Sequence, residues 1–169
     1  MDASSASNIV EPVRSAVDIL IGFGTDFFAF IVIAGIIAVF AFYFGGDRLM
    51  PLIAAIYAGV PLYMAFPFLS ILPDTAYVHI GLYVVLVLVA LIAFSGLSYF
   101  MASNNVGFIN IAVLAALTAG LFLAIAIHIL PIEEVYTFSE PTKALFTSEN
   151  AFFWWLAAPI AGLFFFGRG

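Results

Sequence analysis

Residues 106–130 read VGFINIAVLAALTAGLFLAIAIHIL and contain no Asp, Glu, Lys or Arg. An α-helix rises about 1.5 Å per residue, so about 20 apolar residues cross the ~30 Å hydrocarbon core of a bilayer. Lipid offers the backbone no hydrogen-bond partners, whereas a helix bonds its own peptide groups. The stretch therefore predicts a membrane-spanning helix.

Four other apolar runs accompany this one. Three are predicted to span the bilayer as well: 27–44, 49–72 and 76–101. The last run, 151–166, is shorter, and we predict a fifth spanning helix there, with a tilted re-entrant or membrane-lying helix as the alternative. Its Trp154 and Trp155 suit a membrane interface. The predicted fold is all-α: an integral membrane helical bundle of four to five transmembrane helices in a single membrane domain, 1–169.

The N-terminal region predicts a separate amphipathic helix on the membrane surface, over 9–21. Its apolar face carries Ile9, Val13, Ala16, Val17, Leu20 and Ile21, and its polar face carries Glu11, Arg14, Ser15 and Asp18. Gly22-Phe23-Gly24 should break this helix, because glycine destabilises helices. Thr25 or Asp26 is then expected to cap the next one. An intramembrane proton carrier is the alternative role for Asp26.

The composition excludes several classes of function. Apolar residues make up 66% of the chain and charged residues 8%, against about 45–50% and 25% in soluble domains. With a net charge of −6 and only four basic residues, the chain cannot neutralise the phosphates of nucleic acid. It has no cysteine for disulfides or thiolate metal sites. No nucleophile-and-base pair, phosphate-binding loop or His-Glu-x-x-His motif is evident, so we expect no enzymatic activity and no cofactor.

The second apolar run contains Pro61 and Pro67, which should kink its helix because proline removes a backbone donor and clashes with the preceding turn. In transporters, such broken helices can expose carbonyl groups to a substrate. Kinked membrane helices without a ligand are also common, because neighbouring helices satisfy the freed groups. A structural role for the two prolines is therefore the preferred interpretation.

The helices predicted over 76–101 and 106–130 should be antiparallel neighbours, because only Ala102-Ser103-Asn104-Asn105 joins them. Small residues recur every four positions on the second helix, and larger ones on the first. The two rows are Ala112, Ala116, Gly120 and Ala124, and Tyr83, Val87, Leu91 and Ser95. Since close packing is a main source of association between membrane helices, we expect these rows to pack together.

This pairing would bring His79 level with His128 near one membrane surface, with Asp74 and Glu133 just outside. The four side chains are candidates for a metal site or a pH-sensitive latch, because imidazole binds metals and titrates near neutral pH. The preferred interpretation is that the histidines hydrogen-bond lipid headgroups, a tyrosine or a free carbonyl. We therefore expect no bound metal.

The connection 131–150 is polar and acidic, and its pattern predicts short amphipathic turns on the bilayer. Orientation is undetermined by the positive-inside rule, because the chain has few basic residues and five spans divide them equally between the two sides. These residues are Arg14, Arg48, Lys143 and Arg168. The acidic connection is expected on the outer side.

Several short motifs resemble those of small multi-pass membrane proteins of candidate-phylum, Patescibacteria-like bacteria. They are Gly46-Asp47-Arg48-Leu49, Ala65-Phe66-Pro67, His128-Ile129-Leu130-Pro131, and Phe153-Trp154 with Pro159. The resemblance covers most of the chain and implies a bacterial inner-membrane location, but no activity. A weaker resemblance is to the colicin V production protein family, from which the sequence departs by lacking that family's glycine and arginine pattern in the first helical region.

The function expected from the sequence is assembly within a bacterial cytoplasmic (inner) membrane. The partners expected are the lipid bilayer and either a second copy of the chain or another membrane protein. The alternatives are a small transporter or channel subunit that uses the proline-containing second helix, and a sensor of metal or pH built on the two histidines.

Overall fold

The computed structural model describes residues 3–96, 107–132 and 135–166, with side chains from Ile21 onward except at Phe23 and Asp47. Every regular element in these ranges is helical, which confirms the predicted all-α bundle. The elements are α1 (Ala3–Phe44), η1 (Gly46–Arg48), α2 (Leu49–Met64), η2 (Leu69–Ile71), α3 (Ala76–Ser95), α4 (Phe108–Ile129), α5 (Glu140–Thr147) and α6 (Glu149–Phe166).

Four segments are long and apolar enough to cross a membrane. They are Gly24–Phe44 of α1, Ala76–Ser95, Phe108–Ile129 and Glu149–Phe166. The short last run of the sequence is therefore one of the four. The run 49–72, predicted to be a full span, is not.

The prediction for 49–72 was wrong because Pro67 ends the helix instead of bending it. The helix α2 stops at Met64 after 16 residues, about 24 Å. A residue that precedes proline disfavours the α conformation, and this applies to Phe66. The chain then continues through the short 3-10 turn η2. Of the two predicted kink sites, only Pro61 lies inside the helix.

The predicted break after residue 21 was also wrong, because α1 runs without interruption from Ala3 to Phe44. A glycine costs a helix only about 1 kcal/mol relative to alanine, which a long helix tolerates. Gly22 also has a packing role, since a Cβ at this position would lie 3.1 Å from the Cβ of Ser139. Thr25 is an interior residue whose hydroxyl donates to the Ile21 carbonyl (2.9 Å), and it caps nothing.

The helix ends at Phe44, the last residue of the predicted run 27–44, and Gly45-Gly46 follows. Gly45 has a φ of 100°, a left-handed conformation that residues with a Cβ rarely adopt. The chain therefore turns sharply into η1 and α2.

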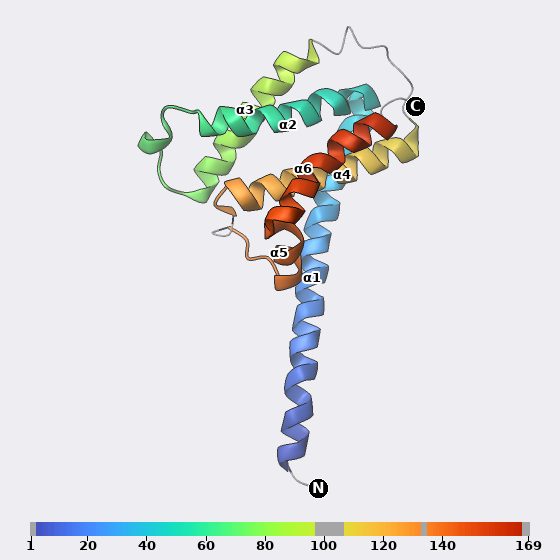
Figure 1. Ribbon diagram of the computed structural model, residues 1–169, viewed down its shortest axis with the longest axis vertical. Helices are drawn as coiled ribbons and strands as arrows, with labels where there is room; N and C mark the ends of the chain where they lie inside the picture. Colours follow the sequence, from blue (N-terminus) through green and yellow to red (C-terminus); the bar gives the residue numbers. More distant parts are fainter. Residues whose placement is uncertain (1–2, 97–106, 133–134, 167–169) are drawn as a thin grey trace.

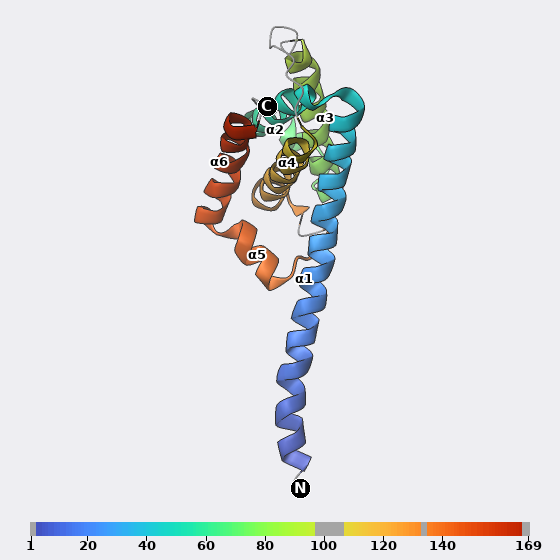
Figure 2. The ribbon, with the colours of Figure 1, turned by 90° about the vertical axis from the view of Figure 1, so that its right-hand side faces the viewer.

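The helix α4 lies at the centre of the bundle, and 56% of the residues in its apolar window are buried, against 6% in that of α1. It runs antiparallel to α1: Phe42 stacks on Phe108 at one end (ring centroids 5.2 Å apart), and Phe30 and Leu123 line one pocket at the other. Figures 1 and 2 show α1 extending along the long axis of the molecule, with α6 on the other side of α4.

Glycines allow the closest helix contacts. A Cβ added at Gly120 of α4 would lie 2.0 Å from the Trp155 ring of α6. In return, Leu117 of α4 fills the space over Gly162 of α6. A Cβ added at Gly162 would lie 2.5 Å from the Cδ1 atom of Leu117. The two helices thus interlock at two points, which is the close approach that membrane helices use in place of a hydrophobic driving force.

The predicted packing of the small-residue row against the third helix was wrong in the choice of partner. Gly120 receives Trp155, Ala124 packs with Phe138 and Phe146, and Ala112 is exposed. The two helices do touch elsewhere, since the Tyr83 ring lies 6.3 Å from that of Phe122. The intervening loop, 102–105, lies outside the described residues.

The larger residues of α3 pack instead against α2, which has its own glycine. A Cβ at Gly59 would lie 2.7 Å from Val87 Cγ2 and 3.1 Å from the Tyr83 ring. Leu91 is partly buried in the same cluster, whereas the Ser95 hydroxyl bonds back to the Ile92 carbonyl. The helices α2 and α3 thus form an antiparallel hairpin, and α2 covers the face of α3 that the sequence assigned to the next helix.

Candidate functional site

The carboxylate of Asp26 is the only buried charged group among the side chains that the structure describes. The residue is 4% exposed and lies in the first turn of the candidate span Gly24–Phe44. Its Oδ1 accepts a hydrogen bond from the Tyr136 hydroxyl (2.7 Å). Its Oδ2 accepts from the Ser139 backbone N–H (2.8 Å) and from the Ser139 hydroxyl (2.6 Å). Three donors more than a hundred residues away therefore hold this charge.

These contacts cap the helix α5 from outside. Ser139 is the N-cap residue of α5, and its own side chain makes no capping bond to the helix. In a capping box, a carboxylate three residues into the helix accepts the N–H of the N-cap residue. Here Asp26 of α1 accepts it, and its negative charge also suits the positive end of α5. The prediction that Asp26 caps the helix that follows it was wrong, because α1 continues through this residue; its carboxylate instead accepts from the N-cap of the distant helix α5.

The environment of Tyr136 follows from the same contact. The Tyr136 hydroxyl donates a hydrogen bond to Asp26. This bond and the negative charge of the Asp26 carboxylate both disfavour loss of the hydroxyl proton. The Asp26 carboxylate thereby raises the pKa of Tyr136, with burial as a lesser cause. The hydroxyl therefore stays a donor throughout the neutral pH range.

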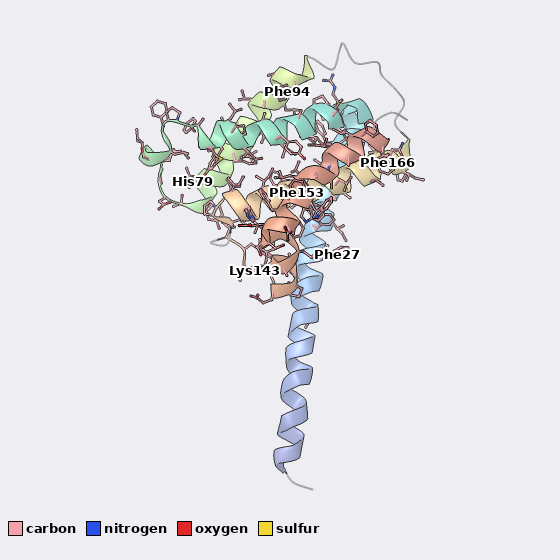
Figure 3. All side chains as sticks on the ribbon, in the orientation of Figure 1. Phe27, His79, Phe94, Lys143, Phe153 and Phe166 are labelled. Carbon is pink, nitrogen blue, oxygen red and sulfur yellow. The ribbon has the colours of Figure 1, made fainter. Side chains whose placement is uncertain are left out.

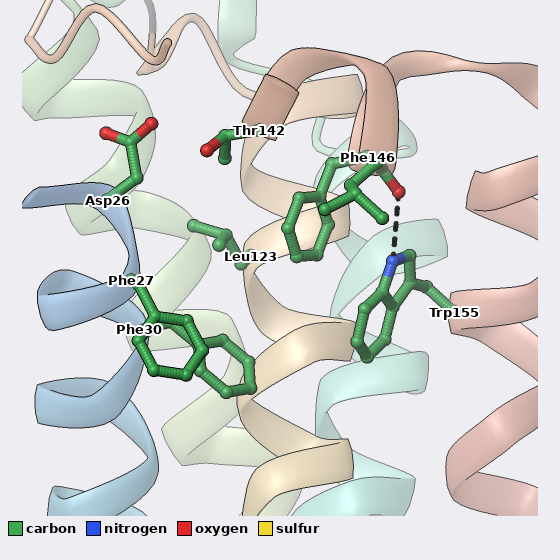
Figure 4. Close-up of a pocket in the computed structure, with 8 residues that line it drawn as sticks. Asp26, Phe27, Phe30, Leu123, Thr142, Phe146 and Trp155 are labelled. Carbon is green, nitrogen blue, oxygen red and sulfur yellow. Dashed lines mark hydrogen bonds between the residues drawn. The ribbon is translucent and has the colours of Figure 1, made fainter. Parts of the chain in front are cut away.

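A pocket of about 170 Å³ opens beside this cap, between α1, α4, α5 and α6 (Figure 4). Its lining residues are mostly aromatic or aliphatic: Asp26, Phe27, Phe30, Leu123, Thr142, Leu145, Phe146 and Trp155. Trp155 stacks on Phe146 with ring centroids 4.9 Å apart, and its Nε1 donates to the Leu145 carbonyl (3.1 Å). One wall of the pocket is therefore tied to α5, and α5 is tied to Asp26.

Two tyrosine hydroxyls form hydrogen bonds that join α2 to α3 and α2 to α6. Tyr83 donates to the Ile56 carbonyl (2.9 Å), and Tyr57 donates to the Leu156 carbonyl, joining α2 to α6. Both carbonyls lie within a helical turn or so of a proline that removes a backbone donor, Pro61 or Pro159. Neither carbonyl is the one four residues before the proline, which loses its helical donor, so these bonds join helices and the structural interpretation of Pro61 stays a prediction.

The histidines lie on different helix pairs. His79 Nδ1 is 2.8 Å from the Tyr63 hydroxyl, and its Nε2 is 3.7 Å from Asp74 Oδ1, at the end of the α2–α3 hairpin (Figure 3 labels His79). His128 is exposed and stacks flat on Phe152 of α6, with ring centroids 4.1 Å apart. Glu133 lies outside the described residues. Only Asp74 and His79 of the four metal candidates are thus brought together.

Within the described part of the chain, no group of three or more His, Cys, Asp or Glu residues could hold a metal ion. The buried polar side chains there are Asp26, Thr118 and Thr142. Thr118 donates to the carbonyl of Leu114 on its own helix (2.6 Å). The described spans thus show no row of polar groups along which a solute would pass.

Sequence reasoning missed the partners of Asp26 and the pocket. The available signals were an acidic residue at the start of an apolar run and Ser139-Glu140-Pro141, a typical helix start with proline in the first turn. Neither signal states that the two sites meet.

Comparisons with protein-family models, with curated proteins and with solved structures give no match.

Proposed function

We propose that this chain is a multi-pass protein of a bacterial cytoplasmic membrane that acts by assembly, binding a partner through the N-terminal part of α1. The partner is a second copy of the chain or another protein at the same membrane. The protein has no catalytic role in this account.

The observation that carries the proposal is the length of α1. Its 42 residues extend about 63 Å, twice the ~30 Å thickness of the hydrocarbon core. If Gly24–Phe44 crosses the bilayer, then the helix from Ala3 to Phe23 continues outside it. Apart from Gly22, which packs against Ser139, this part of α1 lies away from the other described elements in two perpendicular views (Figures 1 and 2).

A projecting helix of this kind gains stability from a neighbour that covers its apolar face. Most helical stability in proteins comes from packing an amphipathic face, because propensity alone makes short isolated helices marginal in water. The sequence of 9–21 has such an amphipathic pattern, with apolar residues at helical spacing. The cap between Asp26 and Ser139 joins α1 to the bundle at the start of the span, so a partner bound to the extension is held at a defined place relative to the bundle.

Site-specific photo-crosslinking in native membranes tests this proposal. A photoreactive benzoyl-phenylalanine at position 13 or 17, on the predicted apolar face, should give one discrete adduct. The matched control at position 15, on the predicted polar face, should give none. The mass of the adduct separates a second copy from another protein. Equal, diffuse labelling at positions 13, 15 and 17 would contradict the proposal.

Fewer observations support the two alternatives. A transporter that uses the second apolar run would need exposed carbonyls in mid-membrane, but α2 is short and the Ile56 carbonyl, near Pro61, accepts a hydrogen bond from Tyr83 of α3. A metal or pH sensor built on both histidines would need them together, but they contact different helices.

A further inference from the structure

The pocket beside α5 is a feature of the bundle that assembly leaves unused. We propose that it binds the acyl chain of a membrane lipid. The assignment follows from the chemistry of its walls, its volume and the place where it opens.

The walls offer a ligand almost nothing but carbon. Six of the lining residues are Phe27, Phe30, Leu123, Leu145, Phe146 and Trp155. The polar atoms at the pocket already have partners within the protein: Asp26 accepts from Tyr136 and Ser139, and Thr142 Oγ1 lies 3.1 Å from the Ser139 hydroxyl. The indole N–H is bonded to the Leu145 carbonyl. A polar solute would lose its bonds to water on entry and gain few in return, which disfavours its binding.

The volume suits part of a hydrocarbon chain. A cavity of about 150 Å³ lined by Leu, Ile and Phe stays dry and binds benzene. The present pocket is slightly larger, about 170 Å³, and is open on one side. It is therefore large enough for a segment of an acyl chain, with the rest of the lipid remaining in the bilayer.

The opening faces the region that lipid would occupy. Phe27 and Leu145 line the pocket but remain 53% and 51% exposed. Phe27 lies one turn into the candidate span Gly24–Phe44, next to the exposed Phe28 and one turn before Ile31. A chain that covers this apolar surface of α1 thus has direct access to the pocket.

Quenching of tryptophan fluorescence by brominated lipid tests the proposal. The chain has two tryptophans, so Trp154→Phe leaves Trp155, in the pocket wall, as the only one. The protein is reconstituted into vesicles of dioleoyl phosphatidylcholine or of its dibrominated form. Brominated chains should quench Trp155 strongly. In the Trp154→Phe background, Leu145→Phe narrows the mouth of the pocket and Leu123→Phe fills its interior, and each should abolish most of this quenching.

Two controls make the result decisive. Leu88 on α3 is as exposed as Leu145, 51%, but lies far from the pocket in sequence and fold, so Leu88→Phe should leave the quenching of Trp155 unchanged. The variant Trp155→Phe retains only Trp154, which is 68% exposed, and its quenching should not depend on the state of the pocket. Leu145 lies at the surface, so its variant provides the test even where Leu123→Phe does not fold. The proposal would be overturned if brominated lipid did not quench Trp155, or if it quenched Trp155 equally in the Trp154→Phe background and in the variants that add Leu145→Phe or Leu123→Phe.

Discussion

The helices α4 and α1 are both long enough to cross a membrane, yet their surroundings differ. More than half of the apolar window of α4 is buried within the protein, whereas only 6% of that of α1 is. The surface of α4 is matched to specific side chains, such as Trp155 over Gly120. Among the described side chains of the α1 span, only Asp26 and Ala41 are buried, and the others are exposed or partly buried. Hydropathy alone does not distinguish the two roles, because both sequences are uniformly apolar.

This comparison predicts its largest effect for a leucine placed at a glycine of each helix. Gly120→Leu on α4 drives a side chain into the Trp155 ring, and overpacking of this kind costs about 3 kcal/mol of unfolding free energy. Gly35→Leu on α1 meets nothing within 4 Å and should cost much less. Thermal unfolding of the purified variants in detergent measures both. Similar melting temperatures for the two variants would show that α4 is not the packed centre.

A smaller effect is expected at Asp26, where α1 contacts α5. Asp26→Ala leaves the Tyr136 hydroxyl and two donors of Ser139 without their acceptor. Both residues are partly exposed, so water can replace much of what is lost, and we expect a total cost of about 2 kcal/mol, near that of one bond to a charged group. Amide hydrogen exchange over 139–147 should accelerate, while exchange in α4 stays slow. Unchanged protection of α5 would mean that Asp26 does not hold it.

The smallest effect concerns the pH dependence of this cap. Because the pKa of Tyr136 is raised in the folded protein, its bond contributes fully below about pH 10, the ordinary tyrosine value, and is lost as pH rises through the raised pKa. In a Trp154→Phe background, the emission of Trp155 reports the docking of α5 through the Leu145 carbonyl. Between pH 9 and 12, the emission of Trp155 should change more in the Trp154→Phe variant than in the double variant Trp154→Phe/Tyr136→Phe. Identical titrations would remove Tyr136 from the cap.

The class of fold and most of the candidate spans were predicted from the sequence. A long stretch without charged residues is what the bilayer core requires of a spanning helix, and such a stretch can be recognised without knowing the rest of the fold. The prediction failed where two local signals competed. Pro67 was interpreted as a kink, but it ends α2, and the glycine pair at 22 and 24 was interpreted as a break, but the helix continues. In both cases the energies involved, about 1–3 kcal/mol, are small enough for the surroundings to decide.

The candidate site lay further beyond the reach of the sequence. Gly120 was recognised as a point of close approach, but its partner was assigned by adjacency along the chain, and Trp155 lies two elements later. The partner of Asp26 is Ser139, 113 residues away. Nothing in the spacing of either residue states that they meet, so only the folded arrangement reveals the cap and the pocket beside it.

The most direct test of this account is the position of the membrane boundary on α1. The chain has no cysteine, so single variants are unambiguous reporters. The measurement uses two preparations of sealed membrane vesicles, each of which exposes a different face of the membrane to the reagent. A membrane-impermeant maleimide should label Ser15→Cys rapidly in one preparation and should not label Gly35→Cys in either. Labelling of Gly35→Cys as fast as that of Ser15→Cys would show that lipid does not cover α1, and would contradict both the membrane-spanning assignment and the projecting helix.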